Sequence, residues 1–233
     1  MTPDRTMIAS ALTEAAQAIN SHRSLDDTLD AIVRAAQQTV PGFEHVGISI
    51  THSNGTIETR AGTGQLVWEV DELQYKLAEG PCYDAIRHGG VTVMDDVDQE
   101  DRWPRYVDEV RRLGLHAQMG LQLYTDDGTL GGLNFYSWKP GVDPDAVQLA
   151  ELFAAHAAIA LGRARHEHQL NESVASRQAI GTAVGIIMER YRIPEDRAFQ
   201  FLVRASSTSN IKLRAIAQEI VDSATEQFLG EKN

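Results

Sequence analysis

The 233-residue sequence predicts an α+β fold in which an antiparallel sheet with helices is followed by a long helical stalk and a bundle of three short helices. Short β-rich runs alternate with helical patterns from residue 45 to residue 138. No strong helix breaker interrupts residues 143–191, and three amphipathic helical patterns occupy residues 174–228. We therefore expect two domains, at residues 1–165 and 166–233.

Residues 1–39 predict two helices, because apolar side chains recur at helical spacing in two runs. The first run is Ile8, Leu12, Ala15 and Ile19, and the second is Leu25, Leu29, Ile32 and Val33. Ser24 stands before two acidic residues and suits the N-cap of the second helix. Pro41 and Gly42 then end that helix.

Five runs of β-forming residues predict the strands of a mostly antiparallel sheet: 45–50, 56–61, 91–95, 117–128 and 130–138. The last two flank Asp127-Gly128, a turn signal typical of a β-hairpin. Helical pieces are expected at 69–78 and 103–113, and Gly131-Gly132 suits a bulge in the last strand.

Asp143 and Pro144 suit the start of a helix that continues to about Tyr191. Its apolar face fades between residues 162 and 173, so an uninterrupted helix and a turn near Gly162 or Asn171 are both open. Such a long helix requires a packing partner. Three apolar side chains without an obvious partner in the same chain predict a homodimer: Leu152, Phe153 and Ile159.

Pro194 separates two further amphipathic helices in the last 45 residues. One apolar face is formed by Ala198, Phe199, Leu202 and Val203, and the other by Leu213, Ile216, Ala217, Ile220, Ala224 and Phe228. Together with residues 174–190 they predict three helices around one small core, which is near the lower size limit for independent stability.

The charge of the chain is distributed unevenly. The net charge is −12, and residues 1–165 hold 13 basic against 24 acidic side chains. Residues 166–233 hold 8 against 9, and the segment 177–214 alone holds 7 basic against 3 acidic. The second domain therefore carries the local positive density that a polyanion would require.

Several classes of function are not supported by any motif. A single cysteine, Cys82, excludes an internal disulfide framework and a multi-cysteine zinc site. No Ser/His/Asp grouping, Walker loop or dinucleotide fingerprint is present, and no apolar run approaches the roughly 20 residues of a membrane span. We therefore expect a cytoplasmic protein without catalytic residues, metal, cofactor or membrane contact.

Residues 181–221 closely resemble the ANTAR domain, an RNA-binding output module of bacterial transcription antiterminators, and the resemblance covers about 170–228. It rests on these elements: Ala183 to Gly185, Met188-Glu189-Arg190, Ala198-Phe199, Leu202, Ser206, Asn210, Lys212-Leu213 and Ala217. Ser207 and Val184 depart from the residues common in the family, which are Gln and Lys.

About 20–165 resembles the GAF domain, a ligand-sensing α+β fold. The layout consists of Gly80-Pro81-Cys82, a strand that ends at Asp95, an Asp-Arg-Trp-Pro turn at 101–104, and a final hairpin. The combination implies a sensor, a stalk and an RNA-binding domain. The GAF domain would control the regulator through an unknown small-molecule ligand, if it binds one.

An RNA-binding surface needs cations for phosphates and polar side chains for unstacked bases. The candidate residues, which we expect to bind hairpins in nascent transcripts, are Arg177, Arg190, Arg204, Ser206, Asn210, Lys212 and Arg214. Tyr191 is the one aromatic candidate for base stacking in this region.

Structural roles compete with these assignments. Ser209 and Asn210 also suit a cap of the third helix, and Arg190 suits a helix C-terminus. Ala183 and Gly185 suit close helix packing, and Cys82 suits either core packing or a stabilised thiolate. Two other functions remain open: a helix-turn-helix-like DNA-binding regulator, and a dimerising GAF sensor that acts through protein partners.

Overall fold

The structure, a computed structural model, describes residue 13 and residues 24–230, with side chains up to residue 226. The chain divides into two compact units, Met1–His166 and Glu167–Asn233. The helix predicted around Ile8 and Leu12 lies outside the described residues. In the described part of the chain, no helix combines the length and the apolar character needed to cross a membrane.

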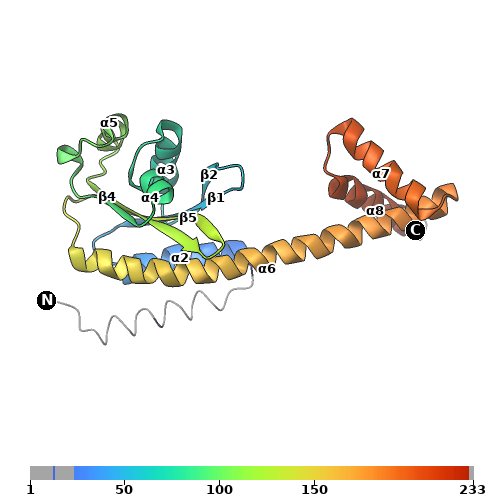
Figure 1. Cartoon of the computed structure of the whole chain (residues 1–233), viewed down its shortest axis with the longest axis horizontal. Helices are drawn as coiled ribbons and strands as arrows, with labels where there is room; N and C mark the ends of the chain where they lie inside the picture. Colours follow the sequence, from blue (N-terminus) through green and yellow to red (C-terminus); the bar gives the residue numbers. More distant parts are fainter. Residues whose placement is uncertain (1–12, 14–23, 231–233) are drawn as a thin grey trace. The chain divides into compact units, whose positions relative to one another are not determined.

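The first unit contains a five-stranded antiparallel sheet in the order β2-β1-β5-β4-β3, as predicted (Figure 1). The strands are β1 (His45–Thr51), β2 (Ile57–Gly62), β3 (Val91–Met94), β4 (Ala117–Thr125) and β5 (Gly128–Ser137). The β4–β5 register shifts next to Gly131, so the predicted bulge is present.

One face of the sheet is apolar and is covered by α2 (Leu25–Thr39) and by the beginning of α6 (Pro144–Tyr191), as Figure 1 shows. The side chains that meet there are almost fully buried, and they include Ile32, Ile48, Leu121, Phe135 and Phe153. The Ser24 hydroxyl accepts a hydrogen bond from the Asp27 amide at the start of α2, which confirms the predicted N-cap.

The opposite face is covered by α3 (Gln65–Leu77), α4 (Pro81–His88) and α5 (Pro104–Arg112), with a 3₁₀ turn η1 at Val97–Gln99 (Figure 1). Glycines occupy this face in three adjacent strands: Gly47, Gly120 and Gly132. A Cβ atom at Gly120 would lie 2.7 Å from the Pro81 carbonyl oxygen and 2.8 Å from the Cys82 nitrogen. The start of α4 therefore rests directly on the backbone of the sheet.

Helix α6 is continuous over 48 residues, so the alternative of a turn near Gly162 or Asn171 is wrong. Phe153 is 1% exposed and belongs to the core of the first unit, which corrects the prediction that it lacks a partner in its own chain. Leu152 and Ile159 are 51% and 69% exposed on the same helix.

The second unit consists of the end of α6 with α7 (Glu195–Ser209) and α8 (Leu213–Gly230), which confirms the predicted helical bundle. Its small core is formed by Ala183, Val184, Ile187, Ala198, Leu202 and Ala217. Phe199 is 41% exposed instead of buried. A Cβ atom at Gly185 would meet nothing within 4 Å, so the prediction of a close helix approach there is wrong.

Candidate functional site

A buried carboxylate, Asp71 on α3, lies against the face of the sheet that α3, α4 and α5 cover. Its Oδ1 atom accepts hydrogen bonds from the Tyr136 hydroxyl, from Asn134 Nδ2 at 3.1 Å and from Gln74 Nε2 at 3.1 Å. Its Oδ2 atom accepts one from Thr59 Oγ1 at 2.7 Å. Side chains from two strands and one helix therefore converge on a single acid that is fully removed from water.

The polar network extends to Cys82 at the start of α4. The Cys82 amide donates to Gln74 Oε1 at 2.8 Å, and its sulfur lies 3.7 Å from the Ser49 hydroxyl. The buried side-chain atoms without a hydrogen-bond partner among the described residues include Gln118 Nε2 and Asn134 Oδ1 on this face. A small polar group bound between the sheet and its covering helices would satisfy them.

Burial governs the proton equilibria of this network. It raises the pKa of Asp71 to about 6, although the hydrogen bonds from Tyr136, Thr59 and Asn134 act in the opposite direction. It also raises the pKa of the Cys82 thiol, and the nearby Asp71 adds to that shift. Cys82 is therefore a packed thiol, and the alternative of a stabilised thiolate is wrong.

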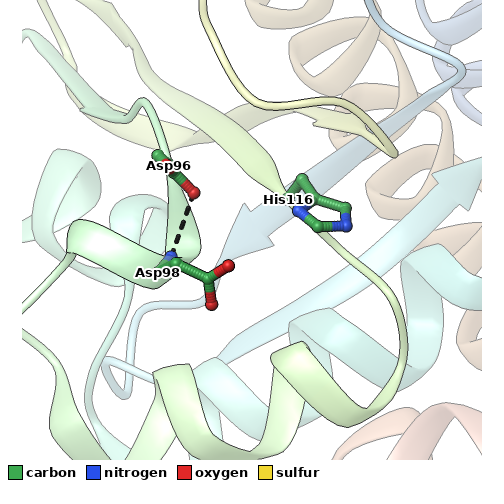
Figure 2. Close-up of side chains that lie close together, drawn as sticks. All are labelled: Asp96, Asp98 and His116. Atoms are coloured by element: carbon green, nitrogen blue, oxygen red, sulfur yellow. Dashed lines mark hydrogen bonds between the residues drawn. The ribbon is translucent and has the colours of Figure 1, made fainter.

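A second group of titratable side chains, Asp96, Asp98 and His116, lies at the edge of the same unit (Figure 2). Their possible ligand atoms all lie within 4.8 Å of one another. Asp96, however, accepts hydrogen bonds from the Asp98 amide and from Gln99 Nε2, both at 3.0 Å. Asp98 forms an ion pair with Arg111 at 2.8 Å. These contacts account for both acids as parts of the turn at η1.

In the second unit, two of the candidate RNA-binding residues line one hollow with a cavity volume of about 580 Å³. Its lining residues are Gln169, Glu172, Ser173, Ser176, Arg177 and Arg214. Arg177 comes from α6 and Arg214 from the first turn of α8, while Lys212 directly precedes α8. The structure therefore brings Arg177 and Arg214 together and places Lys212 two residues from Arg214.

The other candidate cations lie farther along the unit. Arg190 is exposed in the last turn of α6, 13 residues after Arg177, which corresponds to about 20 Å along the helix axis. Arg204 is exposed on α7. The seven candidate residues are thus spread over the unit and do not form one compact cluster.

Ser206 and Asn210 both have a structural part in the turn that follows α7. The Ser206 hydroxyl donates to the Ile211 carbonyl at 2.6 Å. Asn210 adopts the left-handed conformation at the C-cap of α7, with φ 56° and ψ 29°. The alternative that Ser209 and Asn210 cap the third helix is therefore wrong, because both belong to the end of the second.

Two family models match the sequence and decide its relationship. The model of the GAF domain matches residues 22–162, and the model of the ANTAR domain matches residues 168–221. The chain is a GAF–ANTAR protein. GAF domains are sensors, and ANTAR domains are found in RNA-binding antitermination regulators; both are regulatory or binding domains and not catalytic ones. A search of the curated proteins finds no match.

Solved structures confirm the GAF fold of the first unit. The bacteriophytochrome RpBphP3 from R. palustris is 12% identical with a TM-score of 0.59, and the match covers 80% of this chain but 43% of that one. The GAF domain of a phosphoenolpyruvate-protein phosphotransferase from Coxiella burnetii is 17% identical with a TM-score of 0.58, over 71% of this chain and 99% of that one. The corresponding Acinetobacter domain is 15% identical, with a TM-score of 0.55 over 74% and 99%. At these identities the likeness concerns the fold alone.

Sequence reasoning missed three features of the GAF–ANTAR protein. The Asp71 network was missed because no motif joins its members. Glu172 was missed because it lies in a polar stretch without pattern. Phe201 was also missed. It lies outside the apolar stripe of α7, is 48% exposed, and has its ring centroid 6.0 Å from that of Tyr191. An aromatic side chain on the polar face of a helix was the available signal.

We expect Asp71→Asn to change how stability depends on pH. The pKa of Asp71 is raised on folding, so its favourable contribution is present below the unfolded value near 3.8 and is lost as pH rises to about 6. The free energy of unfolding of Asp71→Asn, relative to wild type, should therefore increase by about 3 kcal/mol between pH 3.5 and pH 7.

Urea denaturation followed by tryptophan fluorescence measures this difference, since all three tryptophans lie in the first unit. Asp126→Asn, at an exposed position, is the control and should show no such trend. A difference for Asp71→Asn that stays constant with pH would contradict the assignment.

Proposed function

We propose that this GAF–ANTAR protein binds RNA hairpins in nascent transcripts and favours an antiterminating RNA structure over a terminator. In this proposal residues 166–233 bind the RNA, and the sensor at residues 1–165 controls that binding. The observation that carries it is the hollow shared by Arg177 and Arg214 beside Lys212, in the ANTAR domain of a chain with a net charge of −12.

The arrangement of charge favours RNA phosphates at this position. The first domain carries a balance of −11 and repels polyanions, so binding is confined to the second domain. Guanidinium groups hold phosphate oxygens through two parallel hydrogen bonds. The A-form major groove is too narrow to be read by side chains, so recognition must come from phosphates and from unpaired loop bases.

A second set of contacts fits the loop bases. Tyr191 and Phe201 are 57% and 48% exposed and form a ring pair. Arg204 lies three residues after Phe201 on α7 and therefore shares its side of the helix. Exposed rings flanked by arginine are a common platform for unstacked bases. Arg190 directly precedes Tyr191 in the sequence and adds a second positive charge to the one that Arg204 supplies.

We further propose that a small molecule in the GAF domain controls the RNA-binding activity. Gln118 Nε2 and Asn134 Oδ1, which are buried without a hydrogen-bond partner in the part of the chain that the structure describes, support a polar ligand there. Protonation of Asp71 would change the hydrogen bonds available to such a ligand.

We also propose that the protein is a homodimer through the exposed side of α6. Leu152 and Ile159 are seven residues apart and therefore lie on the same side of the helix. Ile159 also lines a hollow of about 480 Å³ with Val91, Leu121 and Ala155. Apolar side chains of a second copy would fill it, and two linked RNA-binding domains would gain avidity.

Lys212→Ala should weaken the binding of every hairpin by a similar factor, because a phosphate contact carries no sequence information. Loss of one contact reduces the affinity about fourfold at 0.15 M salt and flattens the slope of log affinity against log salt by about 0.7. Filter binding with hairpins selected by the wild-type chain from a random-loop library measures both quantities. Lys139→Ala, which removes the same charge from the first domain, is the control. Unchanged affinity in a folded Arg177/Lys212/Arg214 triple alanine variant, or equal binding of matched DNA duplexes, would contradict the proposal.

Asn210→Gly should leave the protein folded, because glycine adopts the left-handed conformation freely. It should nevertheless reduce discrimination among loop sequences, because it removes the amide that would contact a base. Asn210→Ala should instead lower the stability by about 1 kcal/mol through backbone strain. Sequencing of the hairpins retained by each variant, together with thermal denaturation, separates the two effects. Identical loop preferences in Asn210→Gly and wild type would show that the side chain serves only the turn.

The wild-type chain should scatter light at micromolar concentration as two copies of a 25.7 kDa chain. The double change Leu152→Glu and Ile159→Glu should give a monomer, because charges replace the apolar contacts between copies. Leu113→Glu, at an apolar side chain 36% exposed elsewhere in the first unit, is the control and should remain dimeric. A monomeric wild type would rule out the dimer.

A further inference from the structure

Two cationic side chains lie at the start of α8, and the first turn of that helix contains no acidic residue. Lys212 and Arg214 flank its first residue, and the first turn, residues 213–216, contains no acidic side chain in the sequence. The first turns of α2 and α7 each contain two acids. Because the N-terminal end of a helix is itself partially positive, an anion from another part of the chain would stabilise the cations at α8.

Glu172 on α6 supplies that anion. Its Oε1 atom accepts a hydrogen bond from Arg214 Nη1 at 2.8 Å, although the two residues are 42 positions apart. The hydrogen bond and the positive charge of Arg214 hold the pKa of Glu172 below its usual range. Both side chains remain about half exposed, at 47% and 50%. The pair is therefore accessible to a competing anion.

The hollow around this pair suits a phosphate group. Arg177, Ser173, Ser176 and Gln169 line it from α6, and each of these side chains carries hydrogen-bond donors. Glu172 is the single lining residue in the described hollow that can only accept. The volume of the hollow, about 580 Å³, leaves room for a phosphate beside the ion pair.

We propose that this hollow is a phosphate site for the RNA backbone and that Glu172 is its internal competitor, occupying Arg214 until a phosphate displaces it. The proposal rests on the RNA-binding function proposed above and adds a means by which it is restrained. An exposed ion pair is weak, so a phosphate that bonds Arg214 and Arg177 together can displace Glu172. A phosphate placed so that it contacts only one of the two arginines would not displace Glu172.

Glu172→Gln in the full chain tests the competition. Removal of the competing charge should raise hairpin affinity about fourfold at 0.15 M salt and steepen the salt slope by about 0.7, the effect of one additional phosphate contact. Glu189→Gln is the matched control: it removes the same charge from the same unit, but Glu189 pairs with Arg192 and does not line the hollow. It should change the affinity less than twofold. In an Arg214→Ala background, Glu172→Gln should have no effect.

Lower hairpin affinity in Glu172→Gln would show that Glu172 positions Arg214 for binding, and this overturns the proposal. Equal gains in Glu172→Gln and Glu189→Gln would reveal only the change in net charge, and they overturn it as well. Calorimetric titration with pyrophosphate separates this proposal from the function on which it rests. If no chain binds hairpins but Glu172→Gln binds pyrophosphate more tightly than wild type, the RNA function fails and the restrained anion site stands. If pyrophosphate affinity is also unchanged, both fail.

Discussion

Removal of the Asp71 carboxylate from water is the constraint on which the first unit depends. A buried acid is tolerated only when its oxygens are hydrogen-bonded, and here Thr59, Asn134 and Tyr136 from the sheet meet Gln74 from α3 around it. Gln74 also accepts a hydrogen bond from the Cys82 amide, so the start of α4 belongs to the same network. Close approach of α4 is possible because no side chain stands at Gly120. Burial of the acid, the covering helices and the glycines of the sheet are therefore parts of one arrangement.

The candidate binding charges of the second unit are exposed to water, unlike the buried Asp71 carboxylate of the first. These cations lie at the surface, where water and salt screen each one, so a single contact with a polyanion adds little. In the proposed RNA complex, affinity would come from several phosphates bound together, so the placement of Arg177 and Arg214 in one hollow would matter more than the number of cations in the sequence. The same screening makes the bond between Glu172 and Arg214 easy to exchange. A contact of this strength can restrain binding without preventing it.

Local patterns in the sequence predicted the helices and strands well, but they predicted the contacts between distant residues poorly. The turn signal at Asp127-Gly128, the start of α6 at Pro144 and all five strands depend on neighbouring residues, and the structure confirms them. Tyr136 and Asp71 are 65 positions apart, and Arg214 and Glu172 are 42 apart, so no periodicity relates them. The prediction of which helix residues are buried was only partly correct. Leu152 and Phe153 are both apolar, and the sequence pattern could not show that only Phe153 faces the sheet. The RNA-binding role of the seven candidate residues stays a prediction, because it follows from their charge, their hydrogen-bonding groups and the resemblance to the family.

The position of Glu172 along α6 connects its competition with the proposed dimer. Leu161 is buried in the first core and Ala183 in the second, while none of residues 162–182, all of which the structure describes, is buried. Ala179 and Ile180 are partly buried against the second core, but no apolar side chain of residues 162–178 belongs to either core. Such a stretch is marginal in water, because helices in proteins are stabilised mainly by tertiary packing. Leu170 and Val174 are 57% and 56% exposed on either side of Glu172. In a dimer, a partner helix packed against these two side chains would stabilise the segment and hold Glu172 beside Arg214. Glu172 and Arg177 lie on the same segment of α6, so a signal that loosens it would move both the competing carboxylate and one cation of the proposed phosphate site.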